Sequence, residues 1–196
     1  ITAIGVSYLL QNLALLIFGP EQKSTPALFD LPSLTLGGVT VDGITLLTLG
    51  VTAAIMVGLT LFINLTRMGK AMRAVSEDRD AAELMGISVN KTITITFAIG
   101  SALAAVASVF FGATYTYIKP TTGSMPGIKA FTAAVFGGIG SIPGAMLGGI
   151  LLGVIEILGK AYVSTELGDA FVFAVLIVVL LVKPSGLLGK YVPEKV

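Results

Sequence analysis

The sequence contains no cysteine and no histidine, and only 12% of its 196 residues are charged. Without cysteine the chain forms no disulfide and holds no zinc or iron–sulfur centre through thiolates. Without histidine it lacks the commonest metal ligand and acid–base group of proteins. Metal-dependent and hydrolytic chemistry are therefore poorly supported. We expect a protein that needs no cofactor and is not itself an enzyme.

Hydrophobic residues make up 55% of the chain, and its mean hydropathy is +0.96. Soluble domains carry about 25% charged residues, so this composition predicts an integral membrane protein. The net charge of +1 gives no signal for binding nucleic acid. The first residue is an isoleucine inside an apolar run, with no initiating methionine and no signal-peptide pattern. We therefore expect part of a longer chain.

The one long charged segment, residues 66–91, carries five basic and four acidic residues. Uncharged apolar runs flank it at 44–65 and 92–118. Each run is long enough to cross the ~30 Å hydrocarbon core of a bilayer as a helix. The charged segment is therefore predicted to be a loop between two membrane spans. Because an excess of lysine and arginine marks short cytoplasmic loops, we expect it in the cytoplasm.

Residues 76–86 of this loop have the pattern of a short helix with both ends marked. Ser76 can cap its first turn, acidic residues follow at the positive end of the helix dipole, and Gly86 supplies a left-handed stop. Leu84 and Met85, with two alanines, give a small apolar surface that could dock on a partner. The alternative is a charged loop that only sets topology. The candidate docking residues are Ser76, Glu77, Asp78, Arg79, Asp80, Ala81, Ala82, Glu83, Leu84, Met85 and Gly86.

Two further apolar segments, about 1–20 and 167–182, bring the predicted number of full spans to four. Segment 21–43 carries one basic and three acidic residues, so we expect it outside. Polar and apolar residues alternate there around Gly37 and Gly38, which predicts a small external β-hairpin. The tail contains Lys183, Lys190 and Lys195 and is expected in the cytoplasm.

A glycine-rich region, about 129–159, lies between the third and the last span and includes the stretch FGGIGSIPGAMLGG. Because glycine and proline break helices, we predict two short helices, 129–139 and 144–159, joined by a turn. The flanking 119–129 is expected outside, and the last span must also start outside. The pair must therefore leave and return on one face, as a re-entrant pair or as two tilted short spans.

Broken helices at membrane depth are tolerated where they are buried in protein or line a water-filled cavity. The break is therefore the best pore candidate, and the alternative is close packing through small residues. The candidate pore residues are Gly137, Gly138, Gly140, Ser141, Pro143, Gly144 and Gly148.

Two motifs bear on the energy source. The pattern G-x-x-x-x-G-K-[ST] is absent, so the chain is not expected to bind ATP by itself. Ion-coupled carriers usually hold a charged residue within a span. Only Glu156 comes near that description, and Lys160 lies one helical turn on, so an i,i+4 ion pair is the simpler interpretation. This weakens the hypothesis of an ion-coupled carrier.

With these features in place, the chain resembles the LivH-type permease subunits of bacterial ABC importers for branched-chain amino acids, over essentially 1–196. The most specific parts are SEDRDAAELMGI (76–87), KAFTAAVFGGIGSIPGAMLGG (129–149) and LLVKPSGLLG (180–189). Asp80-Ala81-Ala82 followed by Gly86 is similar to the EAA loop of ABC permeases, whose helix sits in a groove of the ATPase subunit. The downstream Leu-Pro of that pattern is absent, as are the family's N-terminal spans.

The resemblance implies an all-α, polytopic permease with a single transmembrane domain, 1–196, in the bacterial inner membrane. It also implies a second permease of LivM type, two ATPase subunits of LivG and LivF type that hydrolyse ATP, and a periplasmic binding protein. The implied cargo is leucine, isoleucine or valine. An ABC permease for urea, amides or sugars, an ion-coupled amino-acid carrier, and a passive pore or scaffold remain as alternatives.

Overall fold

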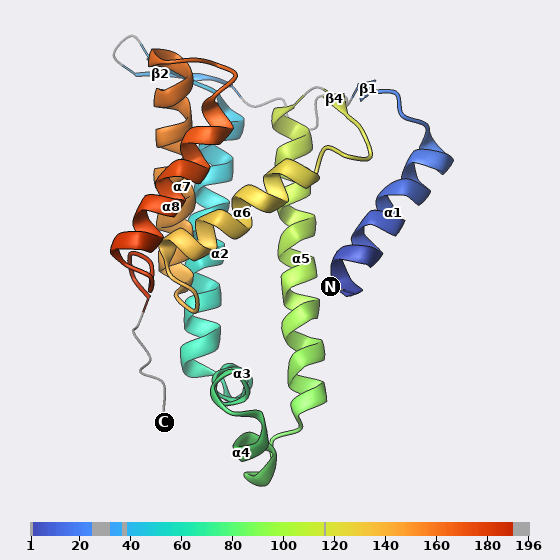
Figure 1. Cartoon of the computed structure of the whole chain (residues 1–196), viewed down its shortest axis with the longest axis vertical. Coiled ribbons are helices and arrows are strands. Elements are labelled where there is room, and N and C mark those ends of the chain that lie inside the picture. Colours follow the sequence, from blue (N-terminus) through green and yellow to red (C-terminus); the bar gives the residue numbers. More distant parts are fainter. Residues whose placement is uncertain (1, 25–31, 37–38, 116, 190–196) are drawn as a thin grey trace. The chain divides into compact units, whose positions relative to one another are not determined.

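The computed structural model describes residues 2–24, 32–36, 39–115 and 117–189. The chain divides into two compact units, Ile1–Gly123 and Ser124–Val196, and each is described by itself. Most of the described residues are helical, as the sequence predicted, and short strands connect some of the helices (Figure 1).

The first unit contains five helices and four short strands among its described residues. The strands β2 and β3 pair antiparallel with Leu34 opposite Val41 and Leu36 opposite Val39, which confirms the predicted hairpin. Its tip, Gly37 and Gly38, lies outside the described residues. The elements are α1 (Thr2–Phe18), β1 (Lys23–Ser24), β2 (Leu34–Leu36), β3 (Val39–Val41), α2 (Gly43–Leu65), α3 (Arg67–Glu77), α4 (Arg79–Leu84), α5 (Val89–Thr114) and β4 (Tyr117–Ile118).

The two long helices α2 and α5 correspond to the predicted spans at 44–65 and 92–118. They contain 23 and 26 residues, about 35 and 39 Å of helix. Their threonine hydroxyls donate to carbonyls of the same helix, as Thr48 does to Ile44 and Thr96 to Thr92. Such internal pairing suits a helix surrounded by hydrocarbon. The third predicted span was too long at its end, because β4 pairs with β1 there.

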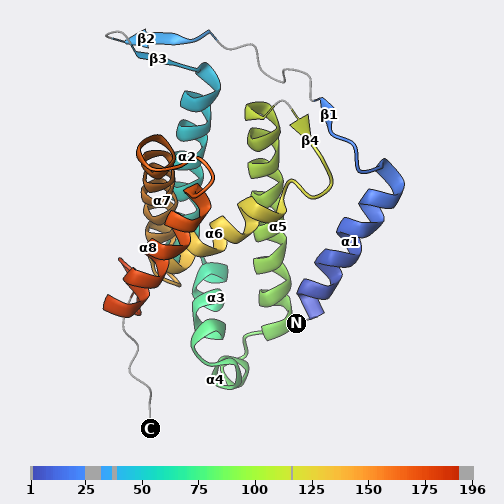
Figure 2. The same cartoon turned by 45° about the horizontal axis from the view of Figure 1, so that its top comes forward.

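The second unit consists of α6 (Ser124–Gly137), α7 (Ile142–Tyr162) and α8 (Gly168–Val182). The three helices pack against one another around Ala133, Phe136, Leu152 and Val172 (Figure 2). The predicted pair 129–139 and 144–159 is therefore present with different bounds. The helix α6 starts inside the segment expected to be an external connection, and α7 is longer than a short helix of a pair.

Helix lengths bear on the number of spans. Within the described residues, three helices are long and apolar enough to cross a membrane, namely α2, α5 and α7. The helices α1 and α8 are apolar but shorter, with 17 and 15 residues, about 26 and 22 Å. The protein is thus a multi-pass membrane protein, and the four full spans stay a prediction.

Candidate functional site

The loop 66–91 folds as two helices rather than the single helix expected at 76–86. Asp78 is extended (φ −156°, ψ 115°) and its carboxylate accepts hydrogen bonds from the amides of Asp80 and Ala81, both at 3.0 Å. Asp78 therefore caps the six-residue helix α4, and the expected Ser76 cap is wrong. Ser76 lies inside α3 and donates to the Arg73 carbonyl at 2.7 Å. Glu77 likewise ends α3 rather than beginning α4.

Sequence reasoning missed α3 altogether, although its signals are present. The hydroxyl of Thr66 accepts from the Gly69 amide at 3.0 Å, which is an ordinary N-cap. Apolar Met68, Met72 and Val75 follow at helical spacing. Charged residues alternate with these apolar positions, so the segment has the composition of a loop.

The predicted stop at Gly86 is confirmed. Its φ is +82°, in the left-handed region. The amide of Ile87 donates to the Ala82 carbonyl at 3.0 Å, which closes the end of α4 in the manner of a Schellman motif.

The apolar surface expected on this segment divides between an inner and an outer face. Ala82 is 4% exposed and packs inside the unit, whereas Leu84 and Met85 are 89% and 83% exposed. We call the exposed residues Asp80, Ala81, Glu83, Leu84 and Met85 the α4 tip. In Figure 1, α3 lies next to the end of α2, and α4 lies farther from that end than α3 does. Large apolar side chains on a charged, protruding turn are typical of a protein contact.

The glycine-rich break lies at residues 138–141. Gly138 and Gly140 have φ values of +110° and +89°, and the Ser141 hydroxyl accepts from the Gly144 amide at 3.1 Å to cap α7. Pro143 and Gly144, expected to belong to the break, lie instead in the first turn of α7. Proline is tolerated there because the first amides of a helix have no intrahelical partner.

The helices α6 and α7 approach closely through glycines. A methyl group on Gly144 would overlap the Gly137 carbonyl, and one on Gly148 would overlap the Ala133 carbonyl. A methyl group on Gly137 would in turn overlap the backbone of Gly144. Three of the candidate pore residues therefore serve close packing, which was the alternative interpretation of their spacing.

The segment after α8 completes the end of α6, a contact that sequence reasoning did not foresee. The amides of Leu187 and Leu188 donate to the carbonyls of Phe136 and Gly137, both at 2.9 Å. They satisfy carbonyls that the end of a helix leaves without partners. Gly186 (φ +75°) also lies against the backbone of Gly138. Two of the sequence segments that carry the family resemblance, 129–149 and 180–189, therefore meet here.

Four charged side chains join the helices of the second unit. Lys129 of α6 pairs with Glu156 of α7 at 2.8 Å and with Asp169 of α8 at 2.6 Å. Glu156 also pairs with Lys160, which confirms the expected i,i+4 pair. Lys129 and Asp169 were missed because they lie on other helices. Since both partners of Glu156 are lysines of the chain itself, an ion-coupling role for this carboxylate has no support.

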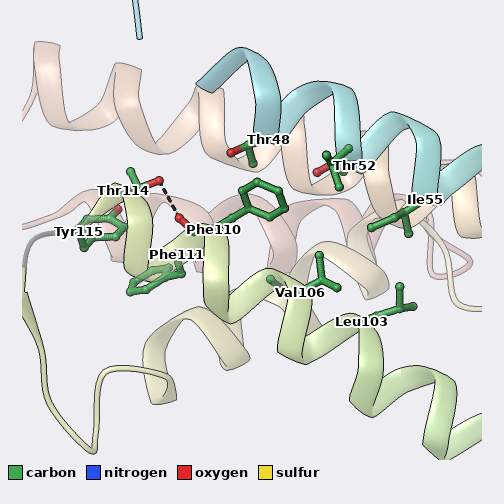
Figure 3. Close-up of a pocket in the computed structure, with 11 residues that line it drawn as sticks. Thr48, Thr52, Ile55, Leu103, Val106, Phe110, Phe111, Thr114 and Tyr115 are labelled. Atoms are coloured by element: carbon green, nitrogen blue, oxygen red, sulfur yellow. Dashed lines mark hydrogen bonds between the residues drawn. The ribbon is translucent and has the colours of Figure 1, made fainter. Parts of the chain in front are cut away.

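A cavity of about 440 Å³ lies between α2 and α5 in the first unit (Figure 3). Its wall is apolar apart from hydroxyl groups, and the Thr114 hydroxyl donates to the Phe110 carbonyl at 2.9 Å. With no charged residue in the lining, this wall can accept an apolar group but cannot by itself neutralise a free amino acid's charges. The lining residues are Thr48, Val51, Thr52, Ile55, Leu103, Val106, Ala107, Phe110, Phe111, Thr114 and Tyr115.

A family model described as "Branched-chain amino acid transport system / permease component" matches residues 1–180. The permease protein BraD of Pseudomonas aeruginosa is 48% identical over 200 residues, covering 100% of this chain and 65% of BraD. LivH of Escherichia coli is 47% identical over 203 residues with the same coverage. Both are described as high-affinity branched-chain amino acid transport system permease proteins. A more distant relative, the fructose import permease FrcC of Rhizobium meliloti, is 30% identical over 110 residues, 53% of this chain and 30% of FrcC.

The chain thus spans 65% of the length of BraD and of LivH. No solved structure matches it. A family match over residues 1–180 and 48% identity along the whole chain establish membership. The chain belongs to the family of permease components of branched-chain amino acid transport systems.

Proposed function

We propose that this chain is the transmembrane part of an ABC importer that carries leucine, isoleucine or valine across the bacterial inner membrane. The identity of 47–48% to permeases named for branched-chain amino acid transport supports this cargo. The partners are a second permease of LivM type, two ATPase subunits of LivG and LivF type, and a periplasmic binding protein.

The α4 tip is the contact through which the ATPase subunits drive this permease. Leu84 and Met85 are almost fully exposed while Ala82 anchors the same helix to the unit. An isolated helix of six residues is not stable in water, so α4 depends on its packing and caps. A fixed helix with two free apolar side chains can transmit a force applied by a partner. The exposure of Leu84 and Met85 is the observation that best supports the coupling role.

ATP-driven uptake tests the transport function. The full-length permease is reconstituted into proteoliposomes with the second permease and the two ATPase subunits, and uptake of labelled leucine is measured with loaded binding protein. We expect uptake that requires ATP and persists when ionophores collapse the ion gradients. Uptake that follows the gradients would indicate a carrier, and uptake of fructose or urea in place of leucine would contradict the cargo.

Substitutions at the α4 tip test the coupling role. Leu84→Asp should abolish both uptake and stimulation of ATP hydrolysis by loaded binding protein, while basal hydrolysis persists. Truncating a hot-spot residue at the centre of a contact costs about 2 kcal/mol or more, and an introduced carboxylate costs further desolvation. The matched control is Ser76→Asp, an exposed position on α3 outside the tip. Normal stimulated turnover in Leu84→Asp would mean that the loop only sets topology.

A further inference from the structure

The helix α3 is fixed directly to the end of the span α2. Thr66 is both the C-cap of α2 and the N-cap of α3, so no linker separates the two helices. A methyl group on Gly69 would overlap the backbone of Ile63, which shows how closely α3 lies against the last turn of α2. Figure 1 shows α3 end-on while α2 runs down the page, so α3 lies crosswise to the span.

The two faces of α3 differ sharply. Gly69 and Val75 are buried on the face that packs against α2 and α5. The basic residues Arg67, Lys70 and Arg73 recur every third position and are exposed. All ion pairs among the described residues lie in the second unit. Within the described part of the chain, these three cations therefore have no acidic partner. Arg73 makes a single side-chain hydrogen bond, to the Asn64 Oδ1 atom at 3.3 Å.

The helices α3 and α4 differ in net charge and in their distance from the span α2. The helix α3 carries three basic residues and one acidic residue, Glu77 at its end. The helix α4 with its cap carries three acidic residues, Asp78, Asp80 and Glu83, and one basic residue, Arg79. Both views place α4 farther from α2 than α3 is (Figures 1 and 2). An anionic surface at the end of α2 would therefore attract α3 and repel α4.

The position of α3 matches the headgroup layer of a bilayer. The headgroups occupy about 5–7 Å on each side of a hydrocarbon core of about 30 Å. A helix about 10 Å across that lies crosswise at the end of a span falls in or next to this layer. Clusters of basic residues at such a position bind acidic lipids, each with a gain of roughly fivefold in affinity.

We propose that the basic face of α3, formed by Arg67, Lys70 and Arg73, binds the phosphate groups of anionic phospholipids in the leaflet at which α2 ends. This contact holds the α2–α3 corner at the membrane surface and leaves the α4 tip projecting beyond it. The inference requires membrane insertion of α2 but neither a particular cargo nor an ATPase.

Lipid binding by the intact permease tests the proposal. The full-length permease with its partner subunits, purified in a neutral detergent, is titrated with phosphatidylglycerol and observed by native mass spectrometry. Phosphatidylcholine with the same acyl chains and inorganic phosphate are the comparison ligands. We expect preferential binding of phosphatidylglycerol that weakens as salt is raised.

The test variant is R67Q/K70Q/R73Q, and the matched control K23Q/R79Q/K119Q removes the same number of charges at exposed positions elsewhere in the same unit. Phosphatidylglycerol binding should fall at least tenfold in the first and stay within about twofold in the second. The charge-conserving variant R67K/R73K should retain binding, which separates loss of charge from loss of folding.

Three results would overturn the proposal. Equal loss of phosphatidylglycerol binding in the test and control variants would reduce the effect to net charge. Tight binding of inorganic phosphate that phosphatidylglycerol does not match would indicate a site for a soluble anion. Dissociation of the ATPase subunits from the test variant, with lipid binding unchanged, would assign the basic face to the ATPase contact.

Discussion

At Gly86 a single backbone angle ends α4 and directs the chain into α5. The φ of +82° lies in the left-handed region, and the space around the Cα atom is open. A substitution there therefore meets strain in the backbone rather than a collision. Asparagine tolerates this conformation, whereas placing a β-branched residue in it costs about 1–2 kcal/mol.

We expect Gly86→Val to weaken coupling and Gly86→Asn to retain most of it. Valine should shift the end of α4 and hence the direction of Leu84 and Met85, because the left-handed turn positions both. The measurement is ATP hydrolysis stimulated by loaded binding protein in the reconstituted complex. If both variants are stimulated equally, the end of α4 is not part of the coupling contact.

The glycines of α7 are not equivalent, and a pair of alanine substitutions separates them. Gly148→Ala should lower the melting temperature of the permease, because its methyl group would overlap the Ala133 carbonyl. Gly153 is the control on the same helix, since nothing lies within 4 Å of its added methyl group. Gly153→Ala should be neutral or stabilising by up to about 1 kcal/mol, from helix propensity alone. Equal changes in melting temperature for the two substitutions would mean that α6 and α7 do not approach each other closely at Gly148.

At the scale of elements, the sequence predicted α2 and α5 well because their apolar runs are long and end at charges. It predicted the end of α4 because only glycine adopts that conformation readily. It failed at Asp78, where one extended residue divides an apparently continuous charged helix into α3 and α4. Local patterns suggest a helix there but do not reveal which of two nearby caps, Ser76 or Asp78, the tertiary packing selects.

Contacts between elements were the least predictable features. The spacing of Glu156 and Lys160 along one helix revealed their pair, but Lys129 meets Glu156 and Asp169 only through the packing of three helices. The same holds for the tail, whose amides reach the end of α6 across 50 residues of sequence. Periodicity describes one helix at a time, so it carries no information about which helices adjoin.

Lys129 should contribute more to stability than Lys160. Lys129 pairs with carboxylates on two other helices, whereas Lys160 pairs with one on its own helix. Lys129→Met leaves Asp169 without this partner and should cost about 1–2 kcal/mol, a value reduced by partial exposure. Lys160→Met should cost less, since Glu156 keeps Lys129. Thermal unfolding of the two purified variants distinguishes them, and a larger loss for Lys160→Met would contradict the network's role in joining helices.

At the scale of the whole molecule, the orientation of the chain follows from the distribution of its basic residues. Segment 66–91 and the tail are expected in the cytoplasm, and the connection before α6 outside. Lys190 and Lys195 of the tail lie outside the described residues. The second unit adds a constraint that the sequence did not contain. Because Leu187 and Leu188 bond to the end of α6, the turn 138–141 lies at the depth of the segment that follows α8.

This constraint bears on how α6 and α7 cross the membrane. The helices α6 and α8 have similar lengths, 14 and 15 residues or about 21 and 22 Å. If α8 runs from the outside to the cytoplasm, α6 does the same, and α7 returns over 21 residues, about 31 Å. Such a pair is better described as two tilted spans than as a shallow re-entrant loop.

Single cysteines test this arrangement, because the chain has no native cysteine that would react. Ile139 is 77% exposed at the turn, so Ile139→Cys should be labelled by an impermeant thiol reagent from the same side as Ser185→Cys. Ser76→Cys should react from that side as well, and Ser124→Cys only from the opposite side. Labelling is measured in intact cells and in inverted membrane vesicles, with the cysteine-free protein as the control. Reaction of position 139 from the outside of intact cells, with position 185 reacting only in inverted vesicles, would contradict the contact between the tail and α6. In that case α6 and α7 would form a re-entrant pair that enters from the outer face.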